Sequence, residues 1–166
     1  MKLSPKYIVQ FKRRRLGKTD YQRRFKLLSS DKPRLVVRRS LNYITAQIVK
    51  ADKKGDVVLA GLTSKQLKKF NWKFACDNLP AAYLTGLLIG KLSQKKKINE
   101  AILDSGLYQS TKGNRIYATV KGAVDAGLNI SIGKDVLPSE ERIKGKHISD
   151  AVEKKFDNVK QQILSD

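Results

Sequence analysis

The sequence predicts an α/β fold, a mixed sheet flanked by helices and preceded by a basic N-terminal arm. Three observations lead to this prediction. Three short runs rich in β-branched residues follow one another between residues 34 and 62, separated only by turns, which is typical of an antiparallel meander. Apolar residues then recur at helical spacing towards the C-terminus. The first 41 residues hold 14 Lys and Arg but only 2 acidic residues.

The arm is expected to cover residues 1–30, as a flexible basic lead followed by a short helix. A Thr-Asp-Tyr-Gln run resembles a capping box with Thr19 as the N-cap residue. The helix that follows would place Tyr21, Phe25 and Leu28 on one stripe towards the body and its cations outwards. Aromatic rings interleaved with cations suit stacking on unpaired bases, although core packing is an equally good interpretation of Phe25.

An α/β core is expected over residues 31–135. Its first strand is Arg34–Arg39, the second covers residues 43–49 and the third 57–62, and the three are joined by short turns. They should form an antiparallel meander. The short apolar run at residues 101–104 is predicted to be a buried fourth strand.

Helices are expected to complete the core and to form a C-terminal segment over residues 136–166. Asn78 precedes a Leu-Pro pair, and Pro near the first turn is a helix-start signal, so a helix should run to about Leu92. A second helix is expected over residues 113–127, with Gly127 as its C-terminal cap. In the last helix, apolar residues recur at spacings of 4, 4, 3 and 4. These residues are Ile148, Val152, Phe156, Val159 and Ile163.

Three meander strands, a helix, a further strand and more helices follow the order of ribonuclease-H-like folds. Catalysis on that fold needs clustered carboxylates that hold two metal ions. Here the first strand carries arginines in place of an acid, and the fourth strand offers only Asp104. We therefore expect no enzymatic activity, no metal and no cofactor. The alternative is a metal-dependent nuclease that pairs Asp104 with Asp125.

The charge distribution indicates a polyanionic partner. The whole formal net charge of +20 lies in the first 97 residues, because residues 98–166 hold 10 basic and 10 acidic side chains. Charge that served only solubility would be expected along the whole chain. Binding to phosphates, by contrast, is strengthened by positive charge concentrated in one region. Seven of the thirteen residues from Lys12 to Arg24 are basic. A basic DNA-packaging protein is a further alternative at this point.

Composition excludes several other classes. A single Cys and a single His rule out a disulfide framework and Cys- or His-rich metal sites. No apolar run approaches the roughly 20 residues of a membrane span, and the N-terminus lacks the apolar segment of a signal peptide. We expect a cytoplasmic protein that binds neither a membrane nor a small-molecule substrate.

Five segments in collinear order match a family pattern. The first is KRRRLGKTDYQRRFKLL at residues 12–28, and the others lie at 32–40, 78–86, 111–128 and 136–145. In these segments the chain resembles the universal 5S-rRNA-binding protein family of the large ribosomal subunit, in its archaeal type. The resemblance implies a core without catalysis, located on the large subunit of cytoplasmic ribosomes. It also implies contacts with 5S rRNA, with large-subunit rRNA and with neighbouring proteins of the central protuberance.

The resemblance also implies which residues bind rRNA. In the arm the matching positions are Lys12, Arg13, Arg14, Arg15, Lys18, Thr19, Tyr21, Arg23 and Arg24. On the first strand and its turn they are Arg34, Arg38, Arg39 and Ser40. The chain departs from the family pattern directly after Ser40, where Leu41-Asn-Tyr43 replaces a polar or basic turn.

Overall fold

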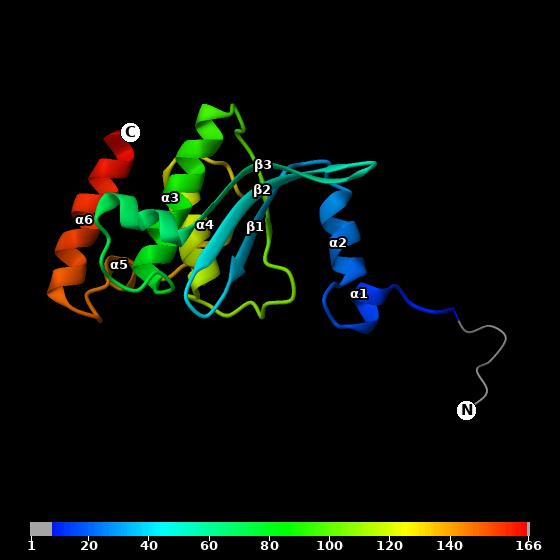
Figure 1. Cartoon of the computed structure of the whole chain (residues 1–166), viewed down its shortest axis with the longest axis horizontal. Coiled ribbons are helices and arrows are strands. Elements are labelled where there is room, and N and C mark those ends of the chain that lie inside the picture. The colour runs from blue at the N-terminus through cyan, green and yellow to red at the C-terminus, as the bar shows by residue number, and fades with distance from the viewer. Residues whose placement is uncertain (1–7, 166) are drawn as a thin grey trace.

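The computed structural model describes residues 8–165, with the backbone alone for Lys134 (Figure 1). Residues 1–7 of the predicted arm lie outside the described residues. An open four-stranded sheet has the strand order β3-β2-β1-β4. Helices pack against it, and two short helices lie below the projecting β2–β3 hairpin, apart from the other helices (Figure 1). The predicted mixed α/β fold with helices flanking the sheet is confirmed.

The sheet contains the predicted meander and one parallel strand. β1 (Arg34–Arg39) pairs antiparallel with β2 (Ile44–Asp52), which pairs antiparallel with β3 (Gly55–Thr63). β4 (Ile102–Asp104) lies parallel to β1 on its other side. The second and third strands are longer than predicted, because Asp52 pairs with Gly55 and the hairpin closes over two residues. Side-chain preference alone does not reveal such backbone pairing at a hairpin tip.

Both predicted central helices are present, the first beginning directly after Asn78 as expected and the second beginning two residues later than expected, after Asn114. α3 (Leu79–Lys95) is capped by Asn78, whose side chain accepts from the backbone N–H of Ala81 at 3.0 Å. α4 (Arg115–Asp125) has an equivalent N-cap in Asn114. Such caps satisfy backbone donors that have no partner within the helix.

The remaining helices are shorter or lie at the ends of the chain. The arm holds α1 (Lys12–Arg15) and α2 (Tyr21–Leu28). The 3₁₀ helix η1 (Ser64–Phe70) follows β3, and η2 (Lys134–Val136), α5 (Glu140–Lys144) and α6 (Asp150–Ser165) complete the chain.

The last helix buries four of the five apolar residues predicted for it, namely Val152, Phe156, Val159 and Ile163. The fifth, Ile148, precedes the helix and is 46% exposed. The helix begins only after Ser149, whose hydroxyl accepts weakly from the backbone N–H of Val152, so that Ile148 falls outside the helical stripe.

The core has two parts that share α3. One part lies between the sheet and the helices α3 and α4, around Leu35, Val37 and Ile48. The other holds η1 and α6 against α3, with Trp72 and Phe156 as its largest fully buried side chains. The body is thus continuous from the sheet to the C-terminal helix, and it forms a rigid support for the arm.

Two glycines let the backbones of α3 and α4 touch. A Cβ atom on Gly86 would lie 1.9 Å from the carbonyl oxygen of Thr119, and one on Gly122 would lie 2.1 Å from that of Tyr83. Neither neighbour is a flexible side chain, so the helices themselves would have to separate. This contact fixes the position of both helices against the sheet.

We therefore predict that Gly86→Ala destabilises the protein by about 3 kcal/mol, since overpacking a tight core commonly costs 1–3 kcal/mol and backbone clashes lie at the upper end. Urea unfolding measures the change. Gly133→Ala is the matched control, because a Cβ there would meet no atom within 4 Å. Equal unfolding midpoints for the two variants would contradict the assigned role of Gly86.

Candidate nucleic-acid interface

The arm turns between α1 and α2 at Gly17, which has φ +60°, a conformation that glycine adopts without strain. The predicted cap is displaced by one residue. Asp20, not Thr19, is the N-cap of α2, and its carboxylate accepts from the backbone N–H groups of Gln22 and Arg23 at 3.0 and 3.1 Å. Thr19 instead accepts from Nε of Arg13 at 2.9 Å. Asp caps a helix as well as Thr does, and Thr19 is left to join the two helices.

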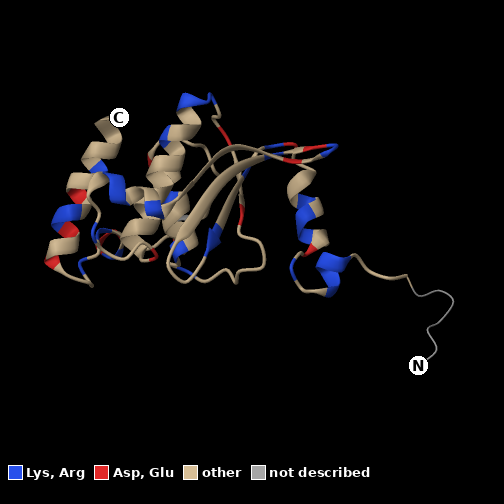
Figure 2. Ribbon diagram, in the orientation of Figure 1, with Lys and Arg blue, Asp and Glu red and all other residues tan. Residues whose placement is uncertain are grey.

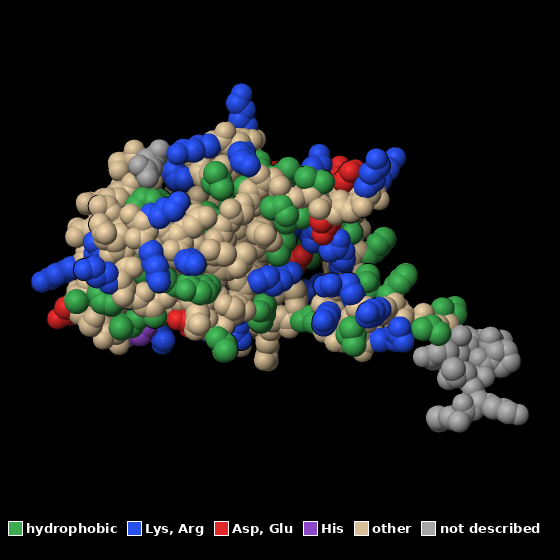
Figure 3. All heavy atoms as spheres, in the orientation of Figure 1, with side chains coloured by type: hydrophobic (Ala, Val, Ile, Leu, Met, Phe, Trp, Pro, Cys, Tyr) green, Lys and Arg blue, Asp and Glu red, His purple; other side chains and the backbone are tan. Residues whose placement is uncertain are grey.

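The orientation predicted for α2 is wrong for Phe25 and for the cations, although Tyr21 and Leu28 are half-buried. Phe25 is 72% exposed, whereas Arg24 donates to the carboxylate of Asp56 at 2.8 and 2.9 Å. Arg23 donates to the turn at residues 105–106 after β4, at 3.0 Å. The body presents polar acceptors to the arm rather than an apolar groove, so cations make the contact. Figure 3 shows hydrophobic side chains on the surface of the arm among its cations.

The contact continues into the sheet as a chain of ion pairs, here called the ion-pair chain: Arg24, Asp56, Arg34, Asp104 and Arg38. Arg34 is only 2% exposed. Its Nη1 lies 2.7 Å from Oδ2 of Asp104, and its Nη2 lies 2.8 Å from Oδ2 of Asp56. The contact with Asp56 is electrostatic, because Nη2 makes no hydrogen bond of good geometry. Arg38 binds Asp104 from the other side, at 3.0 Å.

These contacts govern the pKa values of the two carboxyl groups. Burial raises the pKa of Asp104, but the hydrogen bond and charge of Arg38, the backbone N–H of Gly106 and the charge of Arg34 outweigh it and lower the pKa below its ordinary value. At Asp56 burial is likewise outweighed, by the hydrogen bonds and charge of Arg24 and by the close charge of Arg34, so the pKa is again lowered. Both groups are held as carboxylates in the folded protein.

A lowered pKa in the folded state means that the unfolded chain takes up protons first as the pH falls. The stability contributed by Asp56 and Asp104 is therefore complete above about pH 5 and is lost below about pH 4, as the pH falls through their folded-state pKa values. We predict a melting temperature that is level from pH 7 to 5 and then falls. The fall should be smaller in Asp104→Asn, which cannot titrate. An equally steep fall in both proteins would contradict the prediction.

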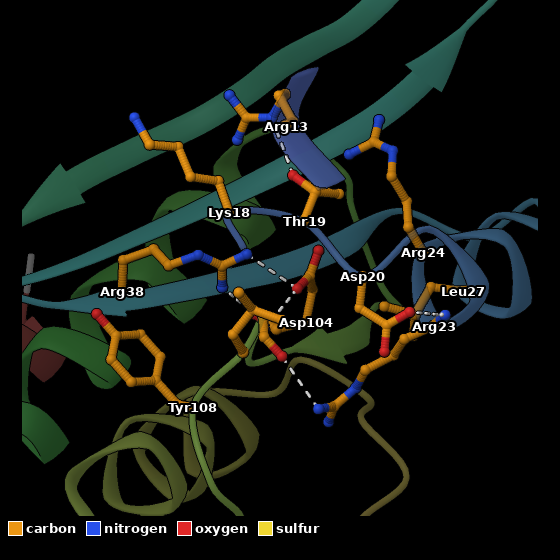
Figure 4. Close-up of a pocket in the computed structure, with 12 residues that line it drawn as sticks. Arg13, Lys18, Thr19, Asp20, Arg23, Arg24, Leu27, Arg38, Asp104 and Tyr108 are labelled. Carbon is orange, nitrogen blue, oxygen red and sulfur yellow. Dashed lines mark hydrogen bonds and ion pairs between the residues drawn. The ribbon is translucent and has the colours of Figure 1, made fainter. Parts of the chain in front are cut away.

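A groove of about 400 Å³ lies between the arm and the body (Figure 4). The arm contributes Arg13, Lys18, Thr19, Arg23 and Arg24 to its lining, and the body contributes Arg38 and Tyr108. The two carboxylates at its wall are already engaged, Asp20 as a helix cap and Asp104 in the ion-pair chain. The groove thus offers several cations and an aromatic ring to a ligand, which is the chemistry of phosphate and base recognition.

Some expected site residues lie beside the groove. Lys12, Arg14 and Arg15 form the exposed surface of α1. Arg39 lies over the ring of Tyr108 at 5.1 Å, and its carbonyl accepts from the Tyr108 hydroxyl at 2.6 Å. These cations extend the basic surface beyond the groove lining, and Figure 2 shows Lys and Arg as blue segments of the arm helices and of the sheet.

Three expected site residues make contacts within the chain. Tyr21 packs its ring at 5.3 Å from that of Phe11. The hydroxyl of Ser40 closes the turn after β1 by bonding both the N–H and the carbonyl of Tyr43 at 3.0 Å. Arg34 is buried in the ion-pair chain, and the structure gives it the role of holding Asp56 and Asp104 in place.

Sequence reasoning missed two contributors, Asp56 and Tyr108. Asp56 lies 32 residues from the arginine that it binds in the arm, and nothing in its local sequence separates it from an ordinary turn residue. Tyr108 follows the fourth strand in an irregular segment. The signal that could have found it is its spacing of four residues from Asp104, since both then lie at the same end of that strand.

The carboxylates considered for nuclease chemistry serve other purposes. Asp104 is bound by two arginines, while Asp125 accepts from the hydroxyl of Tyr83 at 2.7 Å. Within residues 8–165 no group of three or more His, Cys, Asp or Glu side chains is placed to hold a metal ion. No helix in that part of the chain is long and apolar enough to cross a bilayer.

A rigid α/β body, an arginine-lined groove and carboxylates neutralised by arginines define a basic nucleic-acid-binding protein. The model of the family described as "Ribosomal large subunit proteins 60S L5, and 50S L18" matches residues 5–101 and 90–132. The chain belongs to this family.

Two archaeal relatives also support membership of this family. The large ribosomal subunit protein uL18 of Methanococcus maripaludis is 51% identical over 153 residues, which cover 92% of this chain and 79% of the relative. The protein of the same name from Korarchaeum cryptofilum is 49% identical over 154 residues, or 93% and 79% of the two chains. The chain is of the archaeal type. It is an RNA-binding structural protein of the large ribosomal subunit in the cytoplasm, and not an enzyme.

Proposed function

We propose that this chain binds 5S rRNA through its arm and groove, and helps to attach it to the large-subunit rRNA in the central protuberance beside neighbouring ribosomal proteins. The observation that carries the proposal is the groove itself, which is lined by cations from α1, α2 and β1 together with Tyr108. Family membership narrows the ligand from nucleic acid in general to ribosomal RNA.

The proposed mechanism is charge neutralisation on a prepared surface. The exposed cations of α1 and the groove neutralise phosphates and release counterions, which gives affinity. The body holds α2 in place through Arg23 and Arg24, so that part of the arm is ordered before RNA arrives. Ordering in advance lowers the entropy cost of binding. In this proposal residues 1–30 act as the arm, 31–135 as the core that positions it, and 136–166 as a helical segment on the core.

The contacts proposed for the arm are Lys12, Arg13, Arg14, Arg15, Lys18, Thr19, Tyr21, Arg23 and Arg24. Those proposed for the first strand and its turn are Arg38, Arg39 and the backbone at Ser40. We do not carry Arg34 into the interface, because its guanidinium is buried against Asp56 and Asp104.

The experiment is a competition assay with the full chain bound to labelled 5S rRNA. Duplex DNA at equal nucleotide concentration should fail to displace the RNA, and a nuclease protection footprint should appear on the 5S rRNA. Affinity should fall by about 10³–10⁵ between 50 and 200 mM salt if 6–10 phosphates are contacted. Displacement of the RNA by DNA would overturn the proposal and favour general binding to polyanions.

A further inference from the structure

A second set of cations lies outside the groove. Four lysines follow one another within nine residues on η1 and the turn after it: Lys65, Lys68, Lys69 and Lys73, here called the η1 lysine patch. All four are exposed, and no acidic residue occurs between Ser64 and Cys76. None of the ion pairs in the described part of the chain involves them. Their charges are therefore available to a partner.

The patch stands on a rigid base. Leu67, within η1, is fully buried, and Trp72 is almost fully buried. The Trp72 indole N–H donates to the carbonyl of Ala75 at 3.1 Å. In a 3₁₀ helix residues three apart lie on one side, which places Lys65 and Lys68 together on the solvent side. A fixed backbone beneath the lysines reduces the entropy that a ligand must remove.

An open hollow of about 570 Å³ adjoins the patch. It is lined by Asn71, Lys73 and Phe74 from the segment after η1, and by Ala151 and Lys155 from α6. The ring of Phe74 is half-buried, so it is held by the protein while part of it remains accessible. An aromatic ring that lines the same hollow as two lysines suits a nucleotide, with its base stacked and its phosphate neutralised.

The patch and the groove are too far apart to share one short ligand. The strand β3 runs from one to the other. Asp56, at the start of β3, binds Arg24 of the arm, and η1 begins at Ser64, directly after the end of β3. A strand of nine residues spans roughly 27 Å at about 3.4 Å per step. Figure 1 shows η1, in blue-green, beside α3 and α6, at the end of the molecule away from the arm.

We propose that the η1 lysine patch and its hollow form a second RNA-binding surface, which takes the phosphates and one stacked base of an unpaired RNA segment different from the one in the groove. This inference rests on the proposed function, since it assumes that the groove is occupied by 5S rRNA. The protein then holds two RNA segments at the two ends of one rigid sheet. A strongly cationic surface with an aromatic ring favours RNA over an acidic protein. Both partners would pair with the lysines, but only RNA offers bases that stack on the ring.

The test uses the full chain saturated with unlabelled 5S rRNA, to which a labelled 20-nucleotide oligouridine is added. The patch variant is K68Q/K69Q/K73Q. The matched control is K112Q/K144Q/K146Q, which removes the same charge from exposed lysines elsewhere. Fluorescence anisotropy measures oligouridine affinity between 50 and 200 mM salt, and thermal melting verifies that both variants are folded. A third variant, Phe74→Ala, tests the stacking ring.

We expect the patch variant to bind oligouridine at least about tenfold more weakly than the control, with a salt slope lower by about 2, because each lost contact to a single strand removes about 0.7. Phe74→Ala should weaken binding with no change in slope. The affinity for 5S rRNA should be the same in the patch variant and the control. Equal oligouridine affinities in patch and control variants would overturn the inference.

Two further results separate the possible failures. Displacement of oligouridine by polyglutamate at equal charge concentration would overturn the inference in favour of an acidic protein partner. If the wild-type chain does not bind 5S rRNA, the proposed function fails instead. In that case the same comparison of variants without 5S rRNA still decides whether the patch binds RNA.

Discussion

The variant K12Q/R14Q/R15Q should bind 5S rRNA about 100-fold more weakly than the wild-type chain at 0.15 M salt. These three cations make up most of α1, are exposed and have no ion-pair partner in the described part of the chain. Removing three phosphate contacts lowers the slope of log affinity against log salt by about 2–3, which corresponds to this loss at physiological salt. Arg13 is kept, because it bonds Thr19 and holds the turn between α1 and α2.

The control for this prediction is R142Q/K144Q/K146Q, which removes three exposed charges from α5 and the segment after it. It should lower affinity less than threefold, since long-range attraction is screened beyond a Debye length of about 8 Å. Filter binding at several salt concentrations measures both affinity and slope. Similar losses in the two variants would show that net charge, and not the position of α1, determines binding.

The variant Asp104→Ala should lose roughly 3–5 kcal/mol of folding free energy, because it leaves the buried guanidinium of Arg34 without its closest partner, and breaking a buried pair from one side costs this much. Asp56 remains near Arg34 but is partly exposed, so it compensates only in part. Arg38 also loses the carboxylate that orients it at the groove. Urea unfolding measures the stability change.

A second substitution makes the origin of this loss testable. Arg34→Met in the Asp104→Ala background should restore a large part of the stability, because replacing a buried pair with apolar groups is often close to neutral. Glu141→Gln, at an exposed site, should change stability by less than 0.5 kcal/mol. If the double variant is less stable than Asp104→Ala, the buried charge is not the cause of the loss.

The fold was largely predictable because it depends on local patterns that the sequence displays. The first strand has the predicted bounds, and the Asn78 cap lies where its side-chain chemistry indicates. Errors arose where tertiary contacts decide. The third strand begins at Gly55, earlier than predicted, because the backbone of the hairpin is paired as far as its tip. Ile148 matched the helical spacing, but the helix begins after it.

The sequence shows the cations of the candidate site but not their arrangement in space. Charge density and the resemblance pointed to the arm, and the binding role of its residues stays a prediction. The orientation of α2 could not be read from its amphipathic stripe, because the partner surface is polar: Asp56 and the turn at residues 105–106 attract arginines rather than Phe25. The buried position of Arg34 depends on two carboxylates 22 and 70 residues away in the sequence, so composition gave no indication of it.

The outward rings of the arm have a calorimetric consequence. Phe11 and Phe25 stand in water in the free chain, beside the cations that would meet RNA. An interface made of ion pairs alone changes heat capacity little, whereas withdrawing apolar surface from water makes the heat capacity change negative. Titration calorimetry at several temperatures should therefore give an association enthalpy that becomes more negative on warming, and Phe25→Ser should flatten that dependence. The arm would then resemble a small hydrophobic core completed by a nucleic acid rather than by protein.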